Sequence, residues 1–511
     1  MSTVNIFFEI ERLVKYAFDN ELIENLDIIL TRNLLLDLFK VEKPYEGTII
    51  VTENLTEATD VLKNMLDYAF EIGMLENNSD TFRDLLDAKI MGILIPRQSY
   101  VANKFWNIAN NRGTEDATKW YYDFSQKSNY IRMDRIRKNM HWYSPTKFGN
   151  LEITVNLSKP EKDPKAIAAA KNVKQDKYPK CLLCVENVGY AGRLDHFARQ
   201  NHRIVPFRIN GEAWSLQYSP YVYFNEHCIV LSNEHKPMKI EEETFRKMLD
   251  FIDQVPHYFI GSNADLPIVG GSILSHDHFQ GGNHDFPMAK ALVEKEFISK
   301  KYSDVKIGIV KWPMSVIRIN AKDRKTIINI ATEILNKWRN YTDESLGIFA
   351  KTDGIPHNTI TPIARKRGDE FELDLVLRNN RTSVENPLGI FHPHSDLHHI
   401  KKENIGLIEV MGLAVLPGRL KEEMKYVTKI LTGELPFERE AFEKNEMLAK
   451  HIDWMQRLAN EFGIKNSIDQ ANKIIKDSVG LIFSKVLEDA GVYKRDEIGQ
   501  AGLDKFMMTF I

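Results

Sequence analysis

Residues 268–282 of this chain read IVGGSILSHDHFQGG, an apolar run that ends in two histidines and a glutamine. If the run continues as a strand, alternate side chains point to opposite faces, so His276, His278 and Gln280 share one face. Glycine pairs on both sides leave the backbone open to close approach by a ligand. A core strand has no need of three polar groups on one face, so this segment is predicted to carry a functional site.

Cysteines provide the next signal. Cys181 and Cys184 form a CxxC pair, a spacing that lets two thiolates bind one ion from a tight turn. Taken alone, that spacing fits two unrelated cysteines in a turn equally well. A tetrahedral site also needs two further ligands, which histidines would have to supply. The chain has three cysteines in 511 residues, too few for a disulfide framework.

Bulk composition sets the limits. A chain of 511 residues exceeds the length of about 250–300 at which single cores stop growing, so two or three domains are expected. The 68 basic and 71 acidic residues give a net charge of −3, so no global field favours nucleic acid or a membrane. The first 20 residues lack the apolar core of a signal peptide, and no uncharged apolar window reaches about 18 residues. A cytoplasmic protein is expected.

Hydrophobic periodicity predicts a mixed α+β chain. Apolar residues recur at helical spacing up to about Arg137 and again from Phe437 onward. Between them, strands are expected over residues 151–157, 204–209, 221–224, 228–231, 269–279 and 307–310, and helices over 240–255 and 327–335.

The decisive segment also resembles a known family. His276-Asp277-His278-Phe279-Gln280 is similar to the HxHxQ signature of the galactose-1-phosphate uridylyltransferases, a branch of the histidine-triad superfamily. Residues 181–187 resemble that family's CxxC-x-x-N segment, and residues 227–235 resemble the strand that ends in its third metal ligand. Asn263 stands where the family has an active-site asparagine. The order of these motifs is the family's order.

As a whole the chain resembles the class II form of this family, on its extra helical N-terminal segment and on residues 208–214 and 217–221. The resemblance implies an α+β fold with histidine-triad-like antiparallel sheets, and a homodimer. The expected domains are a helical segment (1–140), an N-terminal transferase half (141–300), a C-terminal transferase half (301–435) and C-terminal helices (436–511).

The resemblance also implies roles for single residues. His278 would attack the α-phosphorus of a UDP-sugar, Gln280 would hydrogen-bond a phosphoryl oxygen, and Asn263 would contact substrate. A structural zinc with no open position would be held by Cys181, Cys184, His235 and His276. The implied reaction is uridylyl transfer between UDP-glucose and galactose 1-phosphate in galactose metabolism, through a covalent uridylyl-histidine with ping-pong kinetics.

These residue types suit that reaction. Histidine is a competent nucleophile near neutral pH because its neutral form is well populated. A sugar 1-phosphate leaves and returns as an anion, so the reaction needs no general acid or base. Gln280 can donate hydrogen bonds but cannot titrate. Hydrolases of the histidine-triad superfamily have a third histidine at the position that Gln280 resembles, so the glutamine fits transfer better than hydrolysis.

The remaining polar groups are expected to have surface or solvated roles, without a second metal site. Residues 371–377 lack the histidines of the second metal site found in the better-known class, so no second metal is expected. A solvated polar loop is the favoured interpretation of His392, His394, His398 and His399. Surface roles are favoured over phosphate binding for Arg318, Asn358, Thr359 and Arg365, and a solvated charge run is favoured over nucleotide contact for Lys159 and Lys162.

Two alternatives remain open. One is another nucleotide-sugar phosphorylase or dinucleotide hydrolase of the same superfamily, since the pocket that selects the base is not visible in the sequence. The other is a zinc-binding nucleic-acid adaptor built on the CxxC and a histidine pair, which the near-neutral charge disfavours. Labelling of the protein by UDP-glucose against ATP-type donors, and retention on nucleic acid, would separate them.

Overall fold

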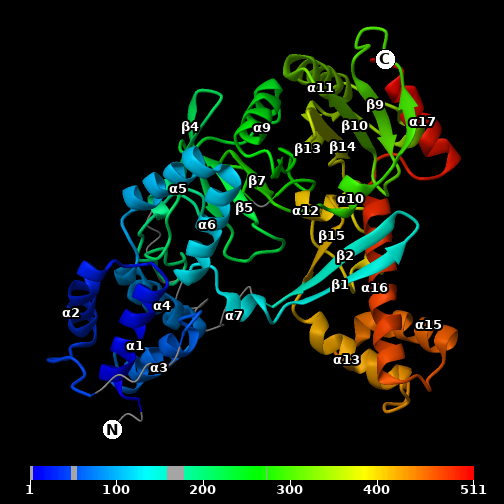
Figure 1. Cartoon of the computed structure of the whole chain (residues 1–511). Helices are drawn as coiled ribbons and strands as arrows, with labels where there is room; N and C mark the ends of the chain where they lie inside the picture. The colour runs from blue at the N-terminus through cyan, green and yellow to red at the C-terminus, as the bar shows by residue number, and fades with distance from the viewer. Residues whose placement is uncertain (1–3, 48–53, 158–177, 272) are drawn as a thin grey trace. The chain divides into compact units, whose positions relative to one another are not determined.

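The computed structural model describes residues 4–47, 54–157, 178–271 and 273–511. Contacts divide the chain into two compact units: residues 1–138, 158–236 and 276–278 in the first, and residues 139–157, 237–275 and 279–511 in the second. Each unit combines helices with largely antiparallel sheet, which confirms the α+β class (Figure 1). The four sequential domains expected above are a different division of the chain and stay a prediction.

Helices make up the beginning of the first unit. They are α1 (Ile6–Asp19), α2 (Ile28–Phe39), α3 (Thr59–Glu71), α4 (Asp80–Leu94), α5 (Gln98–Arg112), α6 (Thr114–Lys127) and α7 (Met133–Ile136). The side chain of Asn5 caps α1 by accepting from the Phe8 amide at 3.2 Å, and Ile10, Leu13 and Ala17 are fully buried along one face. The helical character expected up to Arg137 is therefore confirmed.

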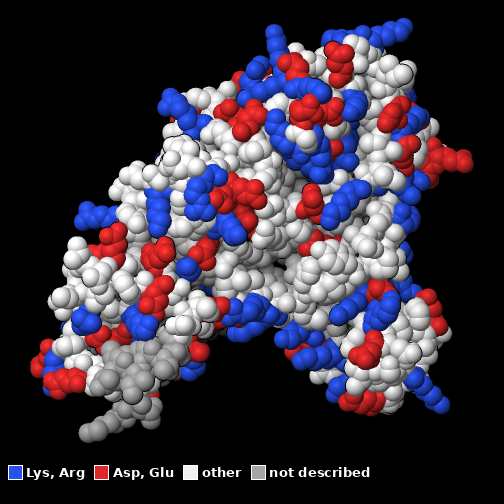
Figure 2. Space-filling view, in the orientation of Figure 1, with Lys and Arg blue, Asp and Glu red and all other residues white. Residues whose placement is uncertain are grey.

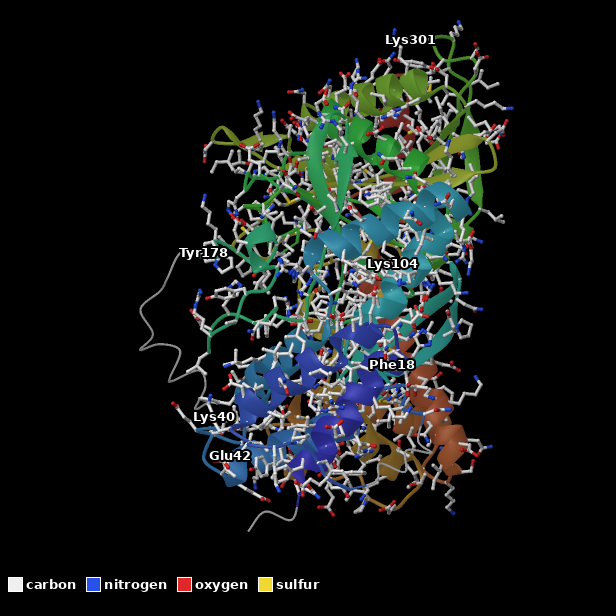
Figure 3. All side chains as sticks on the ribbon, turned by 60° about the vertical axis from the view of Figure 1, so that its left-hand side comes forward. Phe18, Lys40, Glu42, Lys104, Tyr178 and Lys301 are labelled. Atoms are coloured by element: carbon white, nitrogen blue, oxygen red, sulfur yellow. The ribbon has the colours of Figure 1, made fainter. Side chains whose placement is uncertain are left out.

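Strands β3 (Val205–Ile209), β4 (Glu212–Tyr218) and β5 (Cys228–Ser232) follow the short turn η2 (Val185–Asn187). Helix α6 packs against β4: the Tyr218 hydroxyl donates to the Thr118 carbonyl at 2.8 Å, and the Tyr121 and Tyr218 rings lie 5.0 Å apart. Lys104 of α5, labelled in Figure 3, has its ammonium 5.2 Å from the centre of the Trp120 ring of α6. These contacts give the strands a firm helical backing.

The second unit is built around an antiparallel sheet in the order β7-β6-β13-β14-β10-β9-β8. Its strands are β6 (Phe259–Gly261), β7 (His278–Gly282, whose first residue belongs to the first unit), β8 (Val293–Phe297), β9 (Lys306–Val310), β10 (Val316–Ala321), β13 (Asn358–Arg367) and β14 (Glu370–Asn379). Helices α9 (Glu242–Gln254) and α11 (Arg324–Arg339) pack on it. The Trp338 indole of α11 donates to the Thr359 carbonyl at 2.9 Å.

A smaller sheet of β1 (Met140–Thr146), β2 (Gly149–Asn156) and β15 (Leu413–Pro417) belongs to the same unit, with β15 parallel to β2. The remaining elements are α10 (Pro287–Lys290), η3 (Glu344–Leu346), β11 (Lys351–Thr352), β12 (Ile355–Pro356), η4 (Ser395–Leu397), α12 (Leu407–Val410), α13 (Leu420–Leu431), α14 (Arg439–Glu443), η5 (Ala449–His451), α15 (Ile452–Phe462), α16 (Ile468–Ala490) and α17 (Glu497–Met507). Helix α16 touches β1 at Gly480, where a Cβ atom would lie 2.1 Å from that of Ser144.

The surface carries charged side chains of both signs. Figure 2 shows basic and acidic side chains interspersed on the face in view, as the net charge of −3 leads one to expect. Of the helices in the described ranges, none combines the length and the apolar character needed to span a bilayer.

Two expected strands are wrong in whole or in part. Residues 221–224 form the turn that joins β4 to β5, where the Ser219 amide donates to the His227 carbonyl at 2.8 Å and Val222 has a φ of 38°. The strand expected over 269–279 begins only at His278. His276 lies before the strand, and its ring turns toward the two cysteines. Of the three polar residues, only His278 and Gln280 therefore share a strand face.

A buried network of charges crosses the second unit's sheet. Arg318 of β10 binds Asp374 of β14 through two bonds of 2.7 and 2.9 Å, and Arg365 of β13 binds Asp374 at 2.7 Å and Glu372 at 2.6 Å. All four side chains are almost fully buried. Burial would raise the pKa of Glu372, but Arg365 and Arg318 outweigh it and lower that pKa to about 2. The expected surface role of Arg318 and Arg365 is therefore wrong.

Replacing Asp374 with alanine should destabilise the protein by about 3–5 kcal/mol, because two buried guanidinium groups then lose their shared carboxylate. Urea unfolding of wild type and Asp374→Ala measures this change. Glu370→Gln is the control, since its partner Lys306 has an exposed side chain (74%) at 2.9 Å and the loss should stay below about 1 kcal/mol. Equal losses in both variants would contradict the importance of the network.

A second buried carboxylate joins the small sheet to the segment after β7. Glu152 of β2 accepts from His141 Nε2 at 2.7 Å and from His284 Nε2 at 2.8 Å. Burial would raise the pKa of Glu152, but the hydrogen bonds and charges of the two histidines lower it to about 2. The carboxylate therefore stays ionised in the folded protein.

Glu152→Gln should lose stability relative to wild type, and the difference should shrink in acid. The folded pKa of about 2 lies below the ordinary value of 4.5, so the stabilisation is complete above pH 4.5 and is lost as the pH falls toward 2. Urea unfolding of both proteins at several values between pH 6 and pH 3 tests this. A stability difference that does not change over that range would show that the ionised carboxylate contributes nothing.

Candidate active site and metal centre

All four predicted metal ligands come together in the first unit. Cys181 Sγ lies 3.2 Å from His276 Nδ1, and Cys184 Sγ lies 3.2 Å from His235 Nδ1. The two sulfur atoms are 3.5 Å apart, and all four ligand atoms lie within 4.8 Å of one another. Residues 95 positions apart in sequence thus form one cluster.

The cluster fits a small tetrahedral cation. With zinc bonds of about 2.3 Å to sulfur and 2.0–2.1 Å to nitrogen, the edges of a tetrahedron measure about 3.3–3.8 Å. Contacts between Cys and His ligand atoms of 3.2, 3.2 and 3.8 Å come close to that range before any ion is considered. Two thiolates and two imidazoles would fill all four positions of a tetrahedral ion and leave none open.

The CxxC turn is held by an asparagine three residues further on. Asn187 Nδ2 donates to the carbonyls of Cys181 and Cys184 at 2.9 and 2.8 Å. Its Oδ1 in turn accepts from His196 Nε2 at 2.6 Å. The motif at residues 181–187 includes Asn187 but does not predict this clamp, and His196 has no sequence signal beyond its proximity to the CxxC.

His276 presents the nitrogen that a metal requires. Its Nε2 lies 2.7 Å from the Ser232 carbonyl, which can only accept, so Nε2 carries the proton. Nδ1 is left with its lone pair directed at the sulfur atoms. Ser232 is itself bound to the segment that carries the two histidines, since its amide donates to the Asp277 carbonyl at 3.0 Å.

His278 is oriented in the complementary way. Its Nδ1 lies 2.7 Å from the His276 carbonyl, so Nδ1 carries the proton and Nε2 carries the lone pair. The side chain is only 7% exposed, and burial lowers its pKa. The ring is thus a neutral imidazole held at a fixed angle, with its lone pair on Nε2.

Gln280 and Asn263 belong to the second unit. Gln280 follows His278 by two residues in β7, and alternate residues of a strand share a face, so its side chain points the same way as that of His278. Asn263 is buried, and its Oδ1 accepts from the Leu407 amide at 2.9 Å. The Asn263 side-chain oxygen therefore already accepts a hydrogen bond from the protein's own backbone.

The other polar groups named from the sequence do not form a second centre. Each of three histidines binds a nearby carbonyl: His392 and His398 that of Pro393, and His399 that of Asp396. Within the described part of the chain, the Cys181 cluster is the one group of three or more possible ligands. Asn358 and Thr359 are buried in β13, so their expected surface role is wrong, and Lys159 and Lys162 lie outside the described residues.

Comparison with known proteins adds an independent line of evidence. The family profile for the galactose-1-phosphate uridyl transferase N-terminal domain matches residues 23–237, and that for the C-terminal domain matches residues 250–455. A galactose-1-phosphate uridylyltransferase of Caldanaerobacter subterraneus is 57% identical, covering 100% of this chain and 99% of the relative. One of Halalkalibacterium halodurans is 52% identical (100% and 99%), and one of Bacillus subtilis is 50% identical (99% and 98%).

Cys181→Ser should reduce bound metal and stability together, because three ligands hold an ion poorly and the loop then loses its anchor. Elemental analysis of the purified variant should show little metal, and Tm should fall on the order of 5 °C or more. Cys228→Ala is the matched control, since this buried cysteine of β5 lies outside the cluster and the variant should keep its metal. Full metal content in Cys181→Ser would remove Cys181 from the ligand set.

Proposed function

This chain belongs to the galactose-1-phosphate uridylyltransferase family, and we propose that it transfers a uridylyl group from UDP-glucose to galactose 1-phosphate through a covalent intermediate on His278. The transferase activity and its place in galactose metabolism follow from relatives 50–57% identical over essentially the whole chain. The covalent step is an inference from the geometry of the histidine.

The hydrogen bond from His278 Nδ1 to the His276 carbonyl supports this step most directly. It leaves the Nε2 lone pair to attack the α-phosphorus of UDP-glucose. A bond forms between nitrogen and phosphorus, the bond from phosphorus to the bridging oxygen breaks, and glucose 1-phosphate leaves with the electron pair. The ring becomes cationic while Nδ1–H stays bonded to the carbonyl, so this hydrogen bond strengthens as the charge develops.

The second half-reaction reverses the first with a different sugar. A phosphate oxygen of galactose 1-phosphate attacks the same phosphorus, the bond to His278 breaks, and UDP-galactose leaves. Attacking and leaving groups are both anions near pH 7, so no proton has to move. Gln280, two residues along β7 from the nucleophile, can donate a hydrogen bond to a phosphoryl oxygen and has no titration of its own.

Asn263 is assigned to substrate binding. Because its Oδ1 accepts from the Leu407 amide, the amide nitrogen is the group left to donate to a substrate oxygen. Donors of this kind orient a substrate without altering its charge.

We assign the cluster of Cys181, Cys184, His235 and His276 to a structural zinc ion, which suits its two sulfur and two nitrogen ligands. When bound, the ion supplies folding energy and a rigid anchor, with no open position for substrate. His276 then links two roles, since its imidazole is a ligand while its carbonyl orients His278. A homodimer and a cytoplasmic location stay predictions from the sequence.

His278→Ala should abolish the uridylyl adduct and lower the transfer rate by at least about 10⁴-fold, because the attacking nitrogen is lost. Mass spectrometry of the intact protein after UDP-glucose alone should show an acid-labile uridylyl adduct on wild type and none on the variant. Circular dichroism and Tm should show that the variant is folded.

His394→Ala is the control, since His394 is an exposed histidine whose amide donates to Asp489 far from β7 in sequence. It should form the adduct as wild type does. Transfer that requires both sugars to be bound at once, with no adduct at any time, would overturn the mechanism while leaving the family assignment intact.

A further inference from the structure

A pocket in the first unit has more arginine side chains than carboxylates in its lining, and it contains none of the residues assigned above. Its volume is about 60 Å³. The walls come from four separate stretches of chain and comprise Asp84, Tyr130, Arg132, Arg135, Phe197, Ala198, Arg199, Pro220 and Tyr221.

Two of the three arginines are balanced by carboxylates. Arg135 forms a two-pronged pair with Asp84 at 2.9 and 2.6 Å. Arg132 binds the two oxygens of Asp87, a buried residue of α4 behind the pocket wall, at 3.1 and 3.2 Å. These two positive and two negative charges cancel, so neither guanidinium alone makes the pocket positive.

Arg199 is the charge left over. Among the side chains that the structure describes, no carboxylate forms an ion pair with it, and the one hydrogen bond of its guanidinium, to the Ala198 carbonyl, is 3.4 Å long. The guanidinium lies over the Tyr130 ring at 5.3 Å and over the Phe197 ring at 5.5 Å. Stacking fixes the plane of the fork and leaves most of its N–H groups without an acceptor.

The ring beneath Arg199 is firmly held. Tyr130 donates its hydroxyl to the Tyr218 carbonyl at 3.0 Å, and its ring stacks on His202 at 4.3 Å. His202 Nε2 lies 2.9 Å from Gln217 Oε1, which ties this stack to β4. The position of the unpaired charge is therefore set before any ligand arrives.

We propose that this pocket binds a phosphate group, with Arg199 as its principal donor and Arg132, Arg135 and Tyr221 completing the site. A planar guanidinium edge with free N–H groups matches two phosphate oxygens. The donors come from three separate stretches of chain (Arg132 and Arg135 at α7, Arg199 and Tyr221), so they surround a tetrahedral anion better than a flat carboxylate. The volume is several times the roughly 10–15 Å³ that one water needs, which admits a phosphate but not a nucleotide.

Electrostatics within the pocket agree with this geometry. Burial raises the pKa of Tyr221, Arg199 lowers it most among the charged neighbours, and the opposing effects of Asp84 (raising) and Arg135 (lowering) follow, so Arg199 is the main cation acting on this phenol oxygen. The phenol keeps its proton near neutral pH and can donate it to an anion. The group bound is either free inorganic phosphate or the phosphate of a small phosphomonoester whose remainder extends into solvent.

Isothermal titration calorimetry with inorganic phosphate tests the site on the full chain. Wild type should bind, and Arg199→Gln should bind at least about 10-fold more weakly, because the unpaired charge is removed. Arg112→Gln is the matched control: Arg112 lies in the same unit, is 67% exposed and is paired with Asp116, so phosphate binding should not change. Tyr221→Phe, which keeps the ring, should weaken binding less than Arg199→Gln does.

Equal phosphate affinity in wild type and Arg199→Gln would overturn the proposal, as would a loss in Arg112→Gln of the same size. If Arg199→Gln has a lowered Tm without phosphate, the Tyr221→Phe result decides. Tungstate soaked into crystals should give an anomalous peak among Arg132, Arg135 and Arg199, and a peak found only elsewhere also overturns it. Glucose 1-phosphate that competes with phosphate for the Arg199-dependent site indicates a phosphomonoester, and failure to compete indicates free phosphate.

Discussion

Two backbone carbonyls decide what the two histidines of this site can do. The Ser232 carbonyl accepts a hydrogen bond from His276 Nε2, and the His276 carbonyl accepts one from His278 Nδ1. Opposite nitrogens are thereby left with lone pairs: Nδ1 of His276 faces the two cysteines, and the lone pair of His278 lies on Nε2. A carbonyl cannot donate, so neither tautomer can invert without leaving a buried group unsatisfied.

The orientation of the His278 ring thus depends on residues remote in sequence. Cys181 and Cys184 are brought to His276 by a turn that Asn187 clamps from inside, and β5 supplies Ser232. Any change that moves the CxxC turn therefore moves the carbonyl that orients His278. The cluster of possible metal ligands is therefore coupled through the backbone to the orientation of His278.

Several elements could be predicted from the sequence because their signals are local. The period-two pattern of residues 151–157 appears as β2, and the helical face of residues 240–255 appears as α9. The turn at residues 221–224 was mistaken for a strand because aromatic and β-branched residues there resemble strand composition. A positive φ at Val222 reflects how β4 must reverse into β5, a constraint that composition does not carry.

The local sequence also fails to predict which charged side chains are buried, for a related reason. Arg318 and Arg365 look like surface residues when seen alone, since an unpaired arginine is too costly to bury. Asp374, at a distance of 56 residues from Arg318, is what makes burial acceptable, and no local pattern announces that pairing. The same holds for Arg199: that no carboxylate of the described residues pairs with it becomes visible only when each of those carboxylates has been located in space.

The sequence by itself determined the chemistry available: a CxxC, two further histidines that could bind a metal, an HxHxQ segment, and mixed helix and strand in the right order. Those signals are local in the chain, where spacing and residue type suffice. Only the tertiary structure decided which nitrogen of each ring is free and which charges are cancelled. Hydrogen-bond partners and burial are properties of neighbours in space, and the chain brings those neighbours together from positions far apart.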